Sequence, residues 1–93
     1  MFIMVKIRFT SALKRFFPSL TEIQTEGTTV KEVLQSIEKI HPGITTYLVD
    51  DNGRLRKHIN IFVQGDLINN PETLEDTLKN DDEVLILQAL SGG

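Results

Sequence analysis

The stretch TTVKEVLQSIEKIHPG, residues 28–43, decides the fold. Its apolar residues recur at helical spacing and share one face. The residues on this face are Val30, Val33, Leu34, Ile37 and Ile40. Thr29 and Glu32 make a capping box at the start, and Pro42 stops the helix because the residue before a proline is pushed out of the α region. The stretch therefore predicts one amphipathic helix that must bury one face against a second layer.

Strands are predicted on both sides of this helix. Residues 3–9 and 59–64 alternate apolar and polar side chains, which is typical of half-buried strands. A shorter strand is expected at 21–27, and it would form an irregular hairpin with the first strand. Residues 11–20 contain Pro18 and are interpreted as the connection between these two strands.

The last strand is expected at residues 83–88, where Val84, Leu85, Ile86 and Leu87 are apolar on both faces and suit a central position. Turn signals at 51–53 and a loop-rich segment anchored by Leu74 and Leu78 separate it from the helix. The order of elements favours an α+β fold, a mixed sheet with one main helix across one face.

The second face of this sheet would have no layer to cover it. The apolar residues expected there are Phe62, Leu85 and Leu87. A contiguous apolar patch marks a partner site, whereas scattered surface hydrophobes are common. Both interpretations stay open at the level of sequence.

Composition limits the function classes. The chain has 93 residues, 40% of them hydrophobic and 25% charged, which predicts one domain that folds alone. A net charge of −3 makes a nucleic-acid partner unexpected, and the absence of cysteine excludes disulfides and thiolate chemistry. No stretch approaches the ~20 apolar residues of a membrane span, so we expect a cytoplasmic protein with no membrane partner.

Side chains offer no catalytic set. His41 ends the helix and His58 lies in a predicted basic strand, and neither has a second ligand at metal spacing. The basic run RLRKH at 54–58 could contact phosphate or an acidic partner, but it is more typical of a solvated hairpin edge. The run NDDE at 80–83 lacks the spacing of a calcium loop and is interpreted as a turn.

The end of the chain is the remaining candidate. Gly92 and Gly93 follow the last strand closely. Glycine lacks a Cβ atom and allows close approaches, and residues 88–93 would extend about 20 Å, enough to enter a cleft in another protein. A carboxylate activated as a mixed anhydride accepts sulfur, nitrogen or oxygen nucleophiles. Against simple fraying, we predict a domain at 1–88 and a flexible tail at 89–93.

In this combination the sequence resembles the ubiquitin-like sulfur carriers of β-grasp fold, typified by the small subunit of molybdopterin synthase and the thiamine-pathway carrier (MoaD/ThiS). The segments that carry the resemblance are VKIRF (5–9), GTTVKEVLQSIEKIHPGI (27–44), INIFVQG (59–65) and LKNDDEVLILQALSGG (78–93). They cover most of the chain.

The resemblance implies a non-catalytic carrier that acts as a co-substrate. Gly93 would be adenylated by a ubiquitin-activating-like enzyme and converted to a thiocarboxylate, which donates sulfur to a synthase. ATP and its metal ion would belong to the activating partner, and this chain would bind no cofactor or metal. The residues expected to thread into the partner are Ala89, Leu90, Ser91 and Gly92. The residues expected to dock are Phe62, Leu85 and Leu87.

Two departures leave the pathway open. Small subunits of molybdopterin synthase commonly carry proline just ahead of the tail, where this chain has Gln88-Ala89-Leu90, and the turn-bearing stretch 50–58 is longer than in the shortest family members. The stretch RKHINIFVQG is closer to carriers that feed cysteine biosynthesis. The alternatives are a protein modifier that forms isopeptide bonds through Gly93, the small subunit of a molybdopterin synthase, and an RNA-binding module that uses the 54–58 run.

Overall fold

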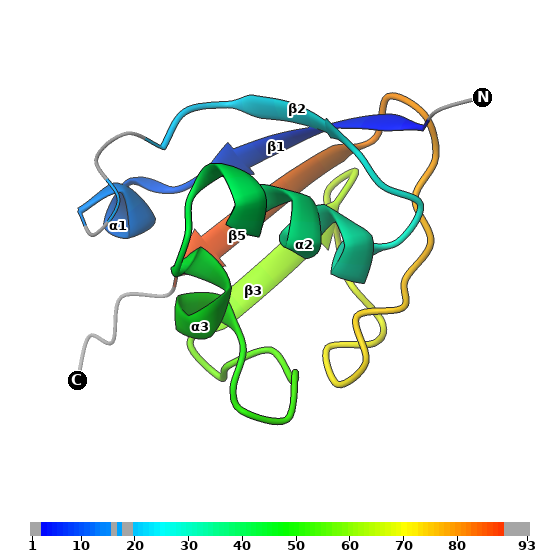
Figure 1. Ribbon diagram of the computed structural model, residues 1–93. Helices are drawn as coiled ribbons and strands as arrows, with labels where there is room; N and C mark the ends of the chain where they lie inside the picture. Colours follow the sequence, from blue (N-terminus) through cyan, green and yellow to red (C-terminus); the bar gives the residue numbers. More distant parts are fainter. Residues whose placement is uncertain (1–2, 16, 18–19, 89–93) are drawn as a thin grey trace.

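A computed structural model of the chain describes residues 3–15, 17 and 20–88, and Figure 1 shows how its elements are arranged. In chain order the elements are β1 (Met4–Phe9), α1 (Ser11–Lys14), β2 (Ile23–Glu26), α2 (Val30–Ile40), α3 (Ile44–Leu48), β3 (Ile59–Val63), β4 (Asp66–Leu67) and β5 (Glu83–Gln88). Helix α2 lies across one face of the sheet (Figure 1). The predicted α+β class, with one main helix on a mixed sheet, is confirmed.

The sheet has the strand order β2-β1-β5-β3-β4. Strands β1 and β5 are parallel, and the other neighbours are antiparallel. Strand β5 therefore lies in the centre, as its continuous apolar run predicts. The first and last strands of the chain pair side by side, so the end of β5 is held within the sheet.

The core lies between α2 and the inner face of the sheet. Val30, Val33, Leu34 and Ile37 are buried, as their spacing predicts. Ile40 was expected on the same face but is 51% exposed, because it is the last helical residue and lies at the edge of the apolar stripe. The inner face of the sheet contributes Val5, Ile7, Ile59, Ile61, Val84 and Ile86, all of them buried.

The cap of α2 differs from the predicted box in one contact. The Glu32 N–H donates to Thr29 Oγ1 at 3.2 Å, as expected. The Glu32 carboxylate, however, accepts hydrogen bonds from the N–H and the hydroxyl of Thr28, at 2.8 and 2.7 Å. These hydrogen bonds hold the pKa of Glu32 below its ordinary value.

Two short helices were not predicted: α1 lies in the predicted connection at 11–20, and α3 lies in a segment to which the sequence assigned no element. The segment after β1 contains α1, whose Leu13 is fully buried, and α3 follows α2 after a turn at Gly43 with φ +97°. Leu74 and Leu78 are buried anchors as predicted, although the segment around them is not helical. Within the described residues, no helix has the length and apolar content needed to cross a membrane.

Candidate functional site

The end of β5 is the point from which the chain continues into residues 89–93. Gln88 is opposite Ile59 of β3, and its N–H donates to Thr10 Oγ1 at 3.3 Å. The Thr10 N–H in turn donates to the Ile86 carbonyl at 3.2 Å. If the parallel ladder between β1 and β5 continued, the Gln88 N–H would donate to the Thr10 carbonyl. Because Thr10 is the N-cap residue of α1, where the chain turns away, its hydroxyl serves as the acceptor instead.

The side chain of Gln88 is held by α3. The Tyr47 hydroxyl donates to Gln88 Oε1 at 3.1 Å. The Tyr47 ring makes edge contacts with Phe17, at a centroid distance of 6.0 Å, and with His58, at 6.2 Å. Figure 1 shows β5 ending beside α3, with α1 on its other side. The last described residue is thus fixed by contacts from three parts of the chain.

The predicted reactive and threading residues come directly after Gln88 in the sequence. Gly93, which we expect to carry the reactive carboxylate, lies outside the described residues. So do the expected threading residues Ala89, Leu90, Ser91 and Gly92. Their roles, and the boundary between a domain at 1–88 and a tail at 89–93, stay predictions.

The predicted docking residues lie on one face of the sheet, opposite α2. Phe62 pairs with Leu85 across β3 and β5, and Leu87 lies two residues further along β5 on the same face. All three side chains are half-buried. The sequence did not single out Leu67 of β4, which is opposite Phe62 and 55% exposed. We name the set Phe62, Leu67, Leu85 and Leu87 the outer-face patch.

A hollow of about 340 Å³ opens on this face beside the outer-face patch. The residues that line it are Arg8, Phe62, Gly65, Glu83, Val84 and Leu85. Arg8 is opposite Leu85 in β1, and its Nε lies 3.4 Å from Glu22 Oε2 in an exposed ion pair, which contributes little to stability. A hollow lined by apolar residues together with an arginine and a glutamate is suited to a protein partner that offers an apolar contact and complementary charges. The outward positions in the alternating first strand are the signal that could have predicted Arg8.

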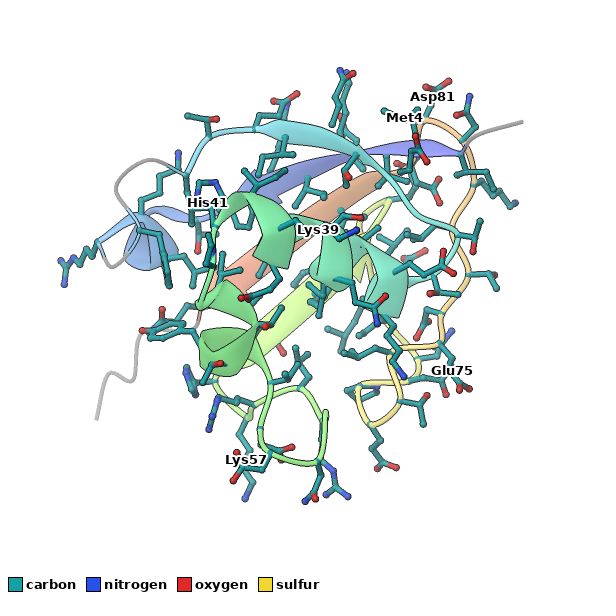
Figure 2. All side chains as sticks on the ribbon, in the orientation of Figure 1. Met4, Lys39, His41, Lys57, Glu75 and Asp81 are labelled. Atoms are coloured by element: carbon teal, nitrogen blue, oxygen red, sulfur yellow. The ribbon has the colours of Figure 1, made fainter. Side chains whose placement is uncertain are left out.

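The histidines and the basic run have structural contacts. His41 lies at the end of α2 (Figure 2), where its backbone N–H donates to the Ile37 carbonyl at 2.8 Å. His58 lies in a turn before β3, so its predicted strand position is wrong. The Arg56 guanidinium donates from Nε and Nη2 to the Thr46 carbonyl, at 3.1 and 3.0 Å. Arg56 therefore ties the 50–56 turn to α3.

The acidic run is a turn, as predicted. Asp82 Oδ2 accepts from the Lys79 N–H at 2.8 Å, and Asn80 Oδ1 accepts from the Met4 N–H at 3.0 Å. Among residues 3–15, 17 and 20–88, no group of three or more histidine, aspartate or glutamate side chains is placed to hold a metal ion.

Solved structures of known proteins share this fold. A chain of the Amycolatopsis orientalis BexX/CysO complex has a TM-score of 0.82 and 28% sequence identity, covering 96% of this chain and 99% of that one. Small archaeal modifier protein 1 from Methanosarcina acetivorans has a TM-score of 0.79 and 28% identity, covering 100% and 99%. CysO from Mycobacterium tuberculosis shares the fold, with a TM-score of 0.79, 24% identity and coverage of 92% and 99%.

No curated protein sequence matches the chain significantly. The model of the ThiS family matches residues 7–93, which include β1 from Ile7 onward, the helices, β5 and the predicted tail. The matched residues form most of the mixed five-stranded sheet and the helix α2 that lies across it. The chain therefore belongs to the ThiS family of ubiquitin-like sulfur carriers, and its fold is the ubiquitin-like β-grasp.

Proposed function

We propose that the protein is a cytoplasmic sulfur carrier whose Gly93 carboxylate is activated and converted to a thiocarboxylate. The observation that carries the proposal is the match of the ThiS family model, which extends through residue 93 and so includes Gly92 and Gly93. The placement of β5 supports it, because the central strand leads directly to the segment that would carry the reactive group.

The proposed reaction takes two steps. A carboxylate oxygen of Gly93 attacks the α-phosphorus of ATP, and pyrophosphate leaves, which gives an acyl-adenylate. A hydrosulfide nucleophile then attacks the carbonyl carbon, and AMP leaves with the former carboxylate oxygen. The net change replaces one oxygen by sulfur. When the thiocarboxylate later gives its sulfur to an acceptor, water restores the carboxylate.

The partners in this proposal are a ubiquitin-activating-like adenylating enzyme and a sulfur-accepting synthase. Both would dock on the outer-face patch while the tail enters their active sites. ATP and its metal ion would be held by the activating enzyme. The BexX/CysO complex shows that a chain with this fold and 28% identity occurs together with another protein. We favour an acceptor in cysteine biosynthesis, from the RKHINIFVQG stretch, over a molybdopterin or thiamine acceptor.

Reconstitution tests the proposal. The purified protein, a candidate activating enzyme, ATP and a sulfide source should give a mass increase equal to the difference between sulfur and oxygen, located in the C-terminal peptide. A variant with one alanine added after Gly93 is the control and should not react. If the wild-type protein stays a plain carboxylate with every activating enzyme from its native cell, the proposal is wrong.

The second candidate is a protein modifier, which the similarity to small archaeal modifier protein 1 favours. A target lysine would attack the same acyl-adenylate, forming an isopeptide bond to Gly93 and releasing AMP. Digestion of native-cell proteins should then yield lysines that carry a C-terminal remnant of this chain. Thiocarboxylate without such conjugates would favour the carrier, and conjugates without thiocarboxylate would favour the modifier.

A further inference from the structure

We propose that Thr10, Tyr47 and Gln88 form a tail anchor, which fixes the point and direction in which the chain leaves β5 toward Gly93. The inference rests on the proposed function, because the direction of the tail matters to a reaction that takes place at its end. Thr10 and Tyr47 are positioning residues in this proposal, since they act on the tail through Gln88.

The backbone of Gln88 is held by a hydrogen bond on one side of β5 and lies beside β3 on the other. On one side it is in register with Ile59 of β3, and on the other its N–H donates to the Thr10 hydroxyl. The last residue of a strand usually frays because its ladder partners have ended. Here the N-cap residue of α1 supplies the missing acceptor, so the ladder between β1 and β5 is extended by one hydrogen bond.

The side chain of Gln88 points toward the helix layer. Val84 and Ile86 occupy the inward positions of β5 and are buried, so the alternation places Gln88 on the same face. It is the one polar residue in that row, and its Oε1 accepts from the Tyr47 hydroxyl. Holding a glutamine side chain in one rotamer costs conformational entropy. The hydrogen bond offsets this cost best when its donor is already fixed, so that no second side chain has to be ordered.

Tyr47 meets that requirement. It lies in α3, and the rings of Phe17 and His58, from two other segments, each contact its ring edge-on. Edge-to-face pairs stabilise a ring in one orientation, and tyrosine has only two side-chain torsions to fix. α3 itself is tied to α2, where the Glu38 carboxylate accepts from Gly43 and Thr45. The phenol hydroxyl is therefore a fixed donor at the end of β5.

The anchor has a kinetic consequence. A carrier that docks through the outer-face patch must also order its tail in the partner's cleft, and the entropy of that ordering weakens binding. Fixing Gln88 limits the ordering to the residues beyond it. Loss of the anchor should therefore raise KM for the carrier and leave kcat unchanged, which is the pattern for a contact that serves binding rather than the transition state.

A double-mutant cycle tests the anchor. Tyr47→Phe removes the hydroxyl and keeps the ring, and Gln88→Leu removes the acceptor. Each should raise the carrier's KM in ATP–pyrophosphate exchange by about three- to tenfold, the range for one neutral hydrogen bond. The double variant should match a single variant rather than multiply the two effects. In the Tyr47→Phe variant, the NMR order parameter of the backbone amide of Gln88 should fall from about 0.85 toward 0.6.

Thr46→Ala is the matched control, because Thr46 is an exposed neighbour of Tyr47 in α3. It should change neither KM nor the order parameter. Unchanged order parameters in Tyr47→Phe would overturn the anchor, as would changed order parameters with an unchanged KM. If no activating enzyme adenylates the wild-type protein, the proposed function fails, and the order parameters alone then decide whether Tyr47 fixes Gln88.

Discussion

Gly27 is the glycine, among those that the structure describes, at which an added Cβ atom would contact its neighbours. It is buried just before α2, and a Cβ atom added there would lie 2.6 Å from Val33 Cγ2 and 3.2 Å from the Val33 backbone nitrogen. The backbone contact cannot be relieved by a rotamer change alone. The short distance between β2 and α2 therefore depends on glycine at this position.

Gly27→Ala should destabilise the protein by about 1–3 kcal/mol, the range for overpacking a filled core. The measurement is the midpoint of urea unfolding at constant m-value. Gly53→Ala is the comparison, because nothing lies within 4 Å of its added Cβ, and its cost comes only from a φ of +80°. The steric explanation fails if the Gly27→Ala variant has the same midpoint of urea unfolding as the wild-type protein.

At single residues, the sequence predicted buried faces better than individual partners. The apolar spacing identified Val30 and Ile37, and the alternation of 59–64 placed Phe62 on the outer face. The hydrogen bond between Tyr47 and Gln88 joins residues 41 positions apart. No local pattern encodes a contact at that separation, so it could only be found in the folded chain.

At the scale of elements, Glu38 joins two helices. It lies in α2, and its carboxylate accepts from the Thr45 hydroxyl at 2.7 Å, the Gly43 N–H at 2.8 Å and the Thr45 N–H at 3.0 Å, all at the start of α3. These hydrogen bonds favour the charged form and hold the pKa of Glu38 below its ordinary value of 4.5. The pKa of Glu32, at the start of α2, is lowered in the same way by Thr28.

These lowered pKa values predict a loss of stability in acid. Between the folded and unfolded pKa values the unfolded chain binds more protons, so the stability contributed by both carboxylates is complete above about pH 5 and falls as the pH drops through the folded values. Thermal unfolding at stepwise pH from 7 to 3 should show a steeper loss for wild type than for the Glu32→Gln/Glu38→Gln variant.

Glu72→Gln is the control for this experiment, because Glu72 is exposed in the loop before Leu74. Its melting temperature should follow the wild-type curve throughout. Parallel curves for wild type and the double variant would contradict the assignment of these two carboxylates.

Element length explains which elements the sequence predicted. Helix α2 has 11 residues and a complete apolar stripe, whereas α1 and α3 have 4 and 5 residues, too few for a helical period to register. Their positions depend on Leu13, Ile44 and Leu48, which are buried in the same core as α2. Short helices of this kind are stabilised by tertiary packing rather than by local propensity.

At the scale of the whole molecule, the two faces of the sheet differ in their surroundings. The inner face and α2 form the core, and the outer face carries the outer-face patch and the hollow that Arg8 and Glu83 help to line. This difference between the two faces was predicted from the sequence, because a single main helix can cover only one face of the sheet. Leu67 was not predicted, because an edge strand of two residues is too short to show an alternating pattern.

Leu85→Ala should weaken docking to the activating enzyme by about tenfold in KM, because the substitution removes apolar surface that docking would bury. Ile40→Ala is the control: Ile40 is 51% exposed, but it lies in α2 on the opposite side of the sheet. It should leave KM unchanged. Equal effects of the two variants would show that the outer-face patch is not the docking surface.

The most direct test of the sulfur-carrier proposal is mass spectrometry of the protein purified from its native cells under non-reducing, thiol-free conditions. The C-terminal peptide should end at Gly93, and part of it should carry one sulfur in place of one oxygen in the terminal carboxyl group. That fraction should disappear when the activating enzyme is deleted. A C-terminal peptide found only as the carboxylate, or a chain that ends at another residue, would contradict the account.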